Sequence, residues 1–257
     1  METVEYEVRD RIGFITLNRP EKRNALNEDL VKNLSSAFTK ASKDNAVRAI
    51  ILRANGEAFC SGADLGYLQQ LQNFSFDENL ADSTRLKELF LQIYTLNKVV
   101  IAQVEGHAIA GGCGLATVCD FIFSVPEAKF GYTEVKIGFI PAIVMVFLIR
   151  KIGDQRARQL LLSGSLITAE EASGLGLITK ISAKDTIQQD VLDFALNLAK
   201  SNSAQAMATT KQMIAEVQQM PLAEALHYAA RMNADARGTR DCKKGIGAFL
   251  NKEKLEW

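Results

Sequence analysis

The chain has 257 residues, 47% of them hydrophobic, which is enough for one large α/β domain or two small ones around a sizeable core. Thirty Lys and Arg residues balance thirty Asp and Glu, which excludes a global basic field for nucleic acid or an anionic membrane. The acidic, polar N-terminus lacks the pattern of a signal peptide, so we expect a cytoplasmic protein. The sequence contains four cysteines without a Cys-x-x-Cys pair, namely Cys60, Cys113, Cys119 and Cys242. They predict reduced, mostly buried thiols, with neither a metal site nor a disulfide framework.

The first part of the chain alternates strands with a helix. Two short strands are expected at Val4–Arg9 and Ile12–Leu17, followed by a loop over residues 18–24. Asn27 is suited to cap a helix whose apolar residues recur at helical spacing, and Ala49–Ala54 reads as a β-branched strand. The order strand, helix, strand predicts a parallel sheet with right-handed crossovers.

The loop over residues 55–65 follows that strand, at the edge of the sheet where α/β proteins usually bind ligands. Gly62 and Ala63 offer backbone N–H groups beside little side-chain bulk. Asp64 is expected to cap a helix or hold a turn there rather than to catalyse. Residues 72–82 are polar, and we expect them to form a mobile flap.

The stretch from Val99 to Pro141 carries the most chemical information. A β-branched strand at Val99–Val104 passes through Gly106 and the pair Gly111–Gly112 into an apolar helix. Glycine lets a ligand carbonyl approach the backbone, and unpaired N–H groups in the first helical turn favour negative charge, so the stretch predicts an oxyanion hole. Glu134 lies between two short apolar runs without an evident structural partner, and is the best candidate for a general acid/base.

Helices dominate the remainder of the chain. The apolar run after Pro141 is too short to span a bilayer and predicts a buried or interface helix. Short helices are expected at Gln155–Leu162 and Thr168–Leu175, before a last strand over residues 177–181. The other expected helices are 86–94, Ile187–Ser201, Ala204–Gln219, Leu222–Ala236 and Cys242–Lys252. We therefore divide the chain into a core over residues 1–185 and a helical region over residues 186–257.

Other enzyme classes fit the residues less well. The glycines after residue 110 break the G-x-G-x-x-G pattern of dinucleotide binding, and no phosphate-binding G-x-x-x-x-G-K-[ST] run occurs. Ser61, His107 and Asp120 could be drawn as a hydrolase triad, but no G-x-S-x-G pattern surrounds Ser61. We expect His107 to be a hydrogen-bonded structural histidine.

Four motifs, in this order and at these spacings, resemble the enoyl-CoA hydratase/isomerase (crotonase) superfamily: NRPEKRNALN, EAFCSGADL, GHAIAGGCGLATVCDFIF and AKFGYTEVKIGFIP. The resemblance covers essentially the whole chain. It implies an α/β fold, built as a crotonase-like spiral of ββα repeats with a C-terminal helical trimerisation region. It also implies homotrimers or homohexamers, an acyl-CoA thioester substrate, and no cofactor apart from the coenzyme A that the substrate carries.

The same resemblance assigns roles by motif position. The thioester carbonyl is expected between the backbone N–H groups of Ala63 and Gly111, with Glu134 as the acid/base. The positions expected to line the substrate pocket are Gly114, Gly112, Leu65, Leu68, Pro141 and Ala142. The positions expected at the coenzyme A are Lys22, Arg23, Ala25, Ala63, Asp64, Leu65 and Lys252, the last reaching the coenzyme A of a neighbouring subunit.

Gly114 departs from the family pattern. Hydratases of the family typically carry two glutamates, and Gly114 stands at the position of the first. Isomerases manage with one glutamate, whereas Gly114 combined with the TEVKIG and PAI segments resembles bacterial hydratases of branched, 3-methylglutaconyl-type thioesters. We expect space beside Gly114 to admit a branch on C3. The favoured function is enoyl-CoA hydration, with a one-glutamate isomerase and a silent acyl-CoA-binding protein as alternatives. The acyl chain and the pathway stay open.

Overall fold

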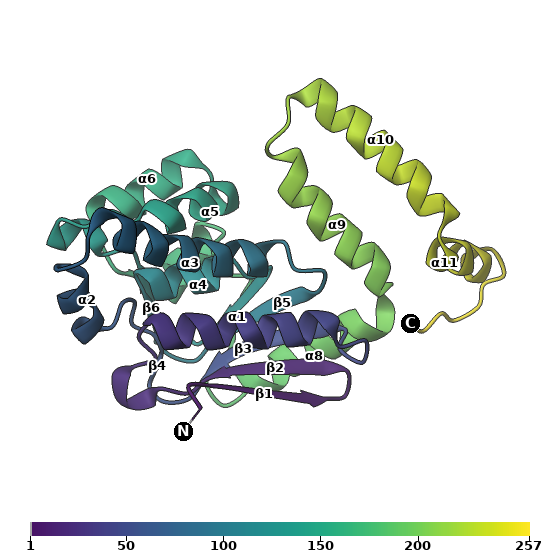
Figure 1. Ribbon diagram of the computed structural model, residues 1–257. Helices are drawn as coiled ribbons and strands as arrows, with labels where there is room; N and C mark the ends of the chain where they lie inside the picture. The colour runs from purple at the N-terminus through teal and green to yellow at the C-terminus, as the bar shows by residue number, and fades with distance from the viewer. Residues whose placement is uncertain (1) are drawn as a thin grey trace.

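Two β-sheets and the helices that cover them form the core (Figure 1). The computed structural model describes residues 2–257. The larger sheet has the order β1-β2-β3-β5-β7-β10, in which only β1 and β2 pair antiparallel, and the smaller sheet has the order β4-β6-β8-β9. The strands of the two sheets are β1 (Val4–Arg9), β2 (Ile12–Leu17), β3 (Ala49–Ala54), β4 (Ala58–Cys60), β5 (Val99–Val104), β6 (His107–Ile109), β7 (Phe121–Ser124), β8 (Lys129–Gly131), β9 (Ile167–Thr168) and β10 (Lys180–Ile181).

Three consecutive ββα turns build this core. Each starts with a strand of the larger sheet, continues into a short strand of the smaller sheet and ends in helices: β3-β4 leads to α2 and α3, β5-β6 leads to α4, and β7-β8 leads to α5. The spiral of ββα repeats expected from the sequence is therefore confirmed. The helices of this part of the chain are, in order, η1 (Pro20–Lys22), α1 (Glu28–Lys43), α2 (Leu65–Leu71), α3 (Phe76–Tyr94), α4 (Gly111–Thr117), η2 (Glu134–Ile137), α5 (Ala142–Ile152), α6 (Asp154–Ser163) and α7 (Ala169–Gly174).

Helix α1 illustrates how the sequence specifies its own packing. The Asn27 side chain accepts a hydrogen bond from the Leu30 N–H at 3.0 Å and so caps the helix, as expected. Leu30, Leu34 and Phe38 recur at helical spacing and are fully buried. Strands β2 and β5 are buried along their whole length, as is usual for strands covered on both faces.

The C-terminal helices divide between the core and an arm. Helix α8 (Ile187–Ser201) packs on β3 and β5 and contributes Ile187, Val191 and Ala195 to the core. Helices α9 (Ala204–Val217), α10 (Leu222–Gly238) and α11 (Arg240–Leu250) extend away from it in Figure 1, and we call these three helices the arm. Helix α10 contains no buried residue in the described chain. The domain boundary at residue 185 stays a prediction.

The expected flap over residues 72–82 is wrong, because most of it belongs to helix α3, which begins at Phe76. Ser75 and Glu78 form a capping box: the Ser75 hydroxyl accepts from the Glu78 N–H at 3.3 Å, and the Glu78 carboxylate accepts from the Ser75 N–H at 2.7 Å. This pattern satisfies two N–H groups that a helix start leaves unpaired. The polar composition of the segment reflects an exposed helix start.

Six strands also differ from expectation: β4, β6, β7, β8 and β9 are not among the expected strands, and β10 is shorter than expected. The loop over residues 55–65 contains β4, and the glycine turn contains β6; each has three residues, too few to show a period of two. The strand expected over residues 177–181 is reduced to β10. The N–H groups of Leu177 and Ile178 instead bond to the Ala172 carbonyl oxygen, at the end of α7.

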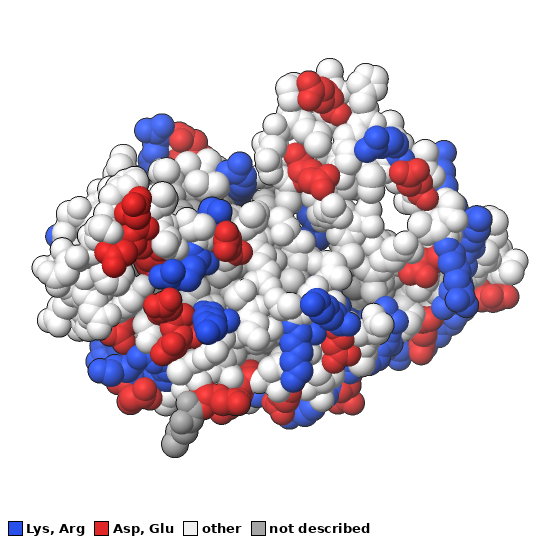
Figure 2. Space-filling model, in the orientation of Figure 1, with Lys and Arg blue, Asp and Glu red and all other residues white. Residues whose placement is uncertain are grey.

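The surface carries both signs of charge. Lys and Arg side chains are interspersed with Asp and Glu over the face that Figure 2 shows. Within residues 2–257, no helix has the length and apolar character needed to cross a membrane.

Candidate active site

Asn24 fixes the loop that leads into the site. Its side-chain amide donates to the carbonyl oxygens of Asn55 at 2.8 Å and Ala58 at 2.9 Å, and its Oδ1 accepts from the Arg19 N–H at 2.8 Å. The residue is fully buried and has φ = +53°, in the left-handed region that asparagine tolerates better than most residues. Asn24 therefore ties the NRPEKRN loop to the turn between β3 and β4.

Ala63 lies in an isolated parallel bridge with Leu26. The Leu26 N–H donates to the Gly62 carbonyl oxygen at 2.7 Å, and the Asp64 N–H donates to the Leu26 carbonyl oxygen at 2.9 Å. In this pairing the Ala63 N–H points away from Leu26, and no hydrogen bond found within residues 2–257 uses it. Gly62 has φ = +92°, which glycine adopts without strain. The Ala63 N–H is thus available to a ligand, as expected for the first donor.

Asp64 holds the next helix in place. Its carboxylate accepts from the N–H groups of Gly66 at 2.9 Å and Tyr67 at 3.3 Å, which caps α2, and it pairs with the Arg19 guanidinium at 3.0 Å. Burial alone would raise the pKa of Asp64, but Arg19 and these N–H groups outweigh it and hold the pKa below its usual value. The expected structural role is confirmed. The contribution of Asp64 to coenzyme A binding stays a prediction.

The second donor is created by an unusual backbone turn at Ala110. This residue has φ = +50° and ψ = −125°, a conformation that costs an L-residue roughly 1–3 kcal/mol. Its N–H donates to the Gly131 carbonyl oxygen at 2.7 Å, which keeps the end of β6 beside the end of β8. The turn ends the strand and starts α4 at Gly111, whose N–H has no partner in the part of the chain that the structure describes.

Close backbone packing brings the two donors together. A Cβ atom on Gly112 would lie only 2.2 Å from the Cys60 carbonyl oxygen, so α4 packs directly on the end of β4. A Cβ atom on Gly62 would lie 3.7 Å from the Gly111 nitrogen. The segment that carries Ala63 therefore lies against the start of α4. This is the arrangement expected of an oxyanion hole.

Glu134 starts η2, directly after β8, and is half-buried. Its Oε2 atom is buried and has no hydrogen-bond partner among the described residues. Burial raises the pKa of Glu134, and its own backbone N–H offsets only part of this effect. Burial also raises the pKa of the Cys113 thiol to about 11, and the charge of Glu134 contributes to this rise. An unpartnered carboxylate with a raised pKa is suited to proton transfer.

The space expected beside Gly114 is filled. A Cβ atom on Gly114 would lie 2.2 Å from Cγ1 of Val144 and 3.0 Å from Cε2 of Phe90. The expectation that Gly114 leaves room for a branch on C3 is therefore wrong. Helix α5 packs on the bare backbone of α4, and glycine at this position permits that contact.

The other expected pocket residues lie on the elements that flank the site. Leu65 and Leu68 belong to α2, and Leu65 is 80% exposed. Pro141 is the N-cap residue of α5, and Ala142 is its first residue. Their contact with an acyl chain stays a prediction.

The expected coenzyme A residues fall into two places. Lys22 and Arg23 are exposed at η1, and the Arg23 carbonyl oxygen accepts from the Ser61 N–H at 3.1 Å, next to the segment of Ala63. Ala25 is buried, and its carbonyl oxygen accepts from Arg19. Lys252 lies two residues after the end of α11. In Figure 1, the labels of α11 and α2 lie on opposite sides of the view.

The alternative hydrolase triad does not form. Asp120 accepts from Lys211 Nζ at 2.6 Å, and Nδ1 of His107 accepts from the Lys129 N–H at 3.2 Å, which confirms a structural role for this histidine. Among residues 2–257, no group of three His, Cys, Asp or Glu side chains is placed to hold a metal ion.

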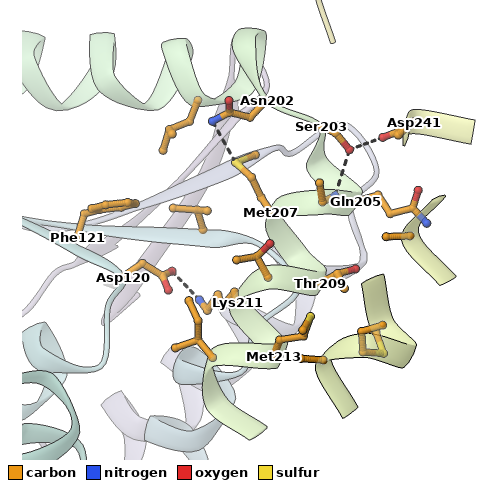
Figure 3. A pocket seen from close by; sticks show the side chains of 18 of the residues that line it. Asp120, Phe121, Asn202, Ser203, Gln205, Met207, Thr209, Lys211, Met213 and Asp241 are labelled. Atoms are coloured by element: carbon orange, nitrogen blue, oxygen red, sulfur yellow. Dashed lines mark hydrogen bonds and ion pairs between the residues drawn. The ribbon is translucent and has the colours of Figure 1, made fainter. Parts of the chain in front are cut away.

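A cavity of about 1390 Å³ lies between the core and the arm. Asp120 and Lys211 form a partly buried ion pair on its wall, and the Ser203 hydroxyl donates to the Asp241 carboxylate at 2.5 Å (Figure 3). None of the expected catalytic residues lines this cavity. It is therefore separate from the oxyanion hole.

Sequence reasoning missed three residues that hold the site: Arg19, Asn24 and Val144. The first two lie inside the NRPEKRNALN motif, where a polar side chain amid loop residues is a signal for a structural hydrogen bond. Val144 has no such signal, because only the packing of α5 on α4 shows its importance.

Two free backbone N–H groups at the start of α4 and on the segment packed against it suit an oxyanion, and the unpartnered Oε2 of Glu134 suits proton transfer. The family model for enoyl-CoA hydratase/isomerase matches residues 7–257, and the chain belongs to this family. It is therefore an enzyme of the enoyl-CoA hydratase/isomerase family.

Individual relatives agree with this assignment. A Thermus thermophilus protein provisionally named an enoyl-CoA hydratase is 39% identical over 241 residues, which cover 94% of this chain and 95% of that protein. The 2,3-dehydroadipyl-CoA hydratase of Escherichia coli is 32% identical, with 94% and 93% covered. The crystal structure of an enoyl-CoA hydratase from Mycobacterium smegmatis superposes with a TM-score of 0.93 at 28% identity, covering 100% of this chain and 99% of that one.

Proposed function

We propose that this chain hydrates 2-enoyl-CoA thioesters, with the N–H groups of Ala63 and Gly111 as the oxyanion hole and Glu134 as the acid/base. The observation that carries the proposal is the buried Oε2 of Glu134, which has no hydrogen-bond partner within residues 2–257. The names of the relatives support hydration in particular.

The reaction follows from these groups. Ionised Glu134 takes a proton from water as the water oxygen forms its bond to C3, and the electron pair of the double bond moves onto the thioester oxygen. The two N–H donors stabilise this oxyanion, and each contributes about 3–4 kcal/mol by comparison with other oxyanion holes. Glu134 then delivers the proton to C2, which yields the 3-hydroxyacyl thioester and restores the carboxylate. The cycle needs no cofactor apart from the coenzyme A of the substrate.

The raised pKa of Glu134 suits both steps. A carboxylate of higher pKa is a stronger base toward water, and its protonated form still transfers the proton to an enolate carbon readily. One carboxylate can therefore serve as base and acid in turn. This removes the need for a second acidic side chain at Gly114.

For the acyl group, we propose a chain without a branch on C3. The resemblance to methylglutaconyl-CoA hydratases rests partly on Gly114, but Val144 and Phe90 fill the space beside that glycine. Lys22 and Arg23 would bind the phosphates of coenzyme A, since both are exposed beside the Ala63 segment.

A second candidate function is double-bond isomerisation, because a single carboxylate can carry one proton between C2 and C4. Hydration in ¹⁸O-water separates the two. We expect the label in a 3-hydroxyacyl product, together with loss of the absorbance of the conjugated thioester. Conversion of a 3-enoyl-CoA to its 2-enoyl isomer without label would favour the isomerase. Thioester binding without turnover of either substrate would favour a silent acyl-CoA-binding protein.

We also propose that the chain assembles into trimers or hexamers. The arm exposes large apolar side chains, namely Leu222 and Leu226 on α10 and Phe249 and Leu250 on α11. It also borders the cavity of about 1390 Å³ beside the core. A neighbouring copy would bury these side chains, and its Lys252 could then approach this chain's coenzyme A. Sedimentation at micromolar concentration should give a trimer or larger. A stable monomer would contradict this proposal.

A further inference from the structure

Among the glycines of α4, Gly114 has the closest side-chain neighbour, which is Val144. Val144 lies in the first turn of α5 and is 4% exposed. Its Cγ1 would be 2.2 Å and its Cβ 3.1 Å from a Cβ atom on Gly114, whereas real Cβ contacts are essentially never shorter than 3.0 Å. The two positions thus form one packing pair, in which Val144 takes the volume that any side chain on Gly114 would need.

The proposed function places the reacting carbons of the substrate on the side of α4 where this pair lies. Gly114 follows Gly111 by three residues in α4, and residues three apart lie on the same side of a helix. A thioester whose oxygen accepts from the Gly111 N–H therefore places C2 and C3 near position 114. The side chains that close this side are those of Val144 and Phe90.

We propose that Val144 is a specificity-determining residue, which closes the acyl site beside Gly114 and excludes thioesters with a branch on C3. The inference deepens the proposed function and relies on it for the position of the acyl chain. Phe90 is the rigid wall of the same region: it is fully buried, and its ring packs edge-on against Phe147 at a centroid distance of 6.2 Å. Val144 has the smaller side chain of the two residues and is the easier one to shorten by substitution.

The direct test is the ratio of kcat/KM for 3-methylcrotonyl-CoA to that for crotonyl-CoA. One methyl group in an apolar pocket changes discrimination by about 10–200-fold, so Val144→Ala should raise this ratio by about 10-fold or more. Val146→Ala is the matched control, since Val146 lies two residues further along α5 and is 43% exposed. It should leave the ratio unchanged.

A binding measurement makes the test independent of turnover. The affinities of butyryl-CoA and 3-methylbutyryl-CoA, which cannot be hydrated, are compared for the wild type and both valine variants. We expect Val144→Ala to favour the branched thioester by a similar factor. If the ratio stays the same in both assays, the inference is overturned. If Val144→Ala shifts the relative affinities of the saturated thioesters as expected but no enoyl-CoA is hydrated, the proposed function fails and the inference on pocket shape stands.

The packing pair has its own thermal test. Gly114→Ala should lower the melting temperature of the wild type by roughly 3–10 °C, because the new methyl group overlaps Val144. In the Val144→Ala variant, Gly114→Ala should lower the melting temperature by less than half as much, because the Cγ1 atom of Val144 is absent. Equal losses in both backgrounds would show that Val144 does not occupy this space, and the inference would fail.

Discussion

Gly112→Ala tests whether the packing of α4 on β4 positions the oxyanion hole. The new Cβ would lie 2.2 Å from the Cys60 carbonyl oxygen and 2.7 Å from the Cys60 Cβ. Ordinary contact starts at 3.4 Å, so α4 and β4 have to separate by about 1 Å. Backbone atoms on both sides make this overlap impossible to relieve by rotating a side chain.

The expected effect on catalysis follows from this displacement. Gly111 is the preceding residue, and its N–H moves with Gly112, while the segment that carries Ala63 stays paired with Leu26. A misplacement of about 1 Å, or the loss of one oxyanion donor, typically costs about 10²-fold in turnover. We therefore expect kcat to fall by about 10²-fold. Overpacking should also lower the free energy of unfolding by about 1–3 kcal/mol.

Steady-state hydration of crotonyl-CoA, with circular dichroism to verify folding, measures both effects. Gly174→Ala is the matched control, because Gly174 lies in helix α7 and a Cβ there has nothing within 4 Å. It should leave kcat unchanged and stabilise the protein slightly. A folded Gly112→Ala variant with wild-type kcat would refute the reasoning.

Three further predictions concern the residues that support the site. Asn24→Ala should lower the free energy of unfolding by about 2–4 kcal/mol in denaturant titrations, since it leaves two carbonyl oxygens and one N–H unpaired; an unchanged midpoint would contradict this role. The pKa of Asp64 is lowered on folding, so its stabilisation is present above its unfolded pKa of about 3.9 and is lost as pH falls through the folded value. The wild type and Asp64→Asn should therefore converge in stability below about pH 4, and a constant difference would count against the Arg19 ion pair. Because burial raises the pKa of Glu134, the acid limb of kcat/KM should lie above the ordinary value of 4.5, and a limb at or below it would be inconsistent with this assignment.

The sequence predicts the site best where the chemistry depends on the backbone. The strand that runs through Gly111 into a helix needs only local patterns, and the structure contains it. The secondary structure of residues 72–82 is harder to predict, because polar composition is common to exposed helices and loops. Only the Ser75 and Glu78 pair marks a helix start there. The residues that line the expected pocket depended on the family resemblance.

The neighbour of Gly114 could not be predicted from the sequence. A glycine in a helix indicates that something lies close to the backbone, but the sequence does not reveal whether this is a ligand or another helix. The neighbour is Val144, thirty positions along the chain, and its contact depends on how α5 packs against α4. Tertiary packing of this kind is absent from local patterns of hydrophobicity.

We propose that Glu134 transfers the proton during hydration of an enoyl-CoA held by Ala63 and Gly111. The most direct measurement compares kcat for crotonyl-CoA hydration by the wild type and Glu134→Gln, together with the affinity of each for butyryl-CoA. Glutamine retains the size of the side chain but cannot exchange a proton. We expect kcat to fall by about 10²–10⁴-fold while the affinity changes by less than about threefold. Wild-type turnover by Glu134→Gln would contradict the account.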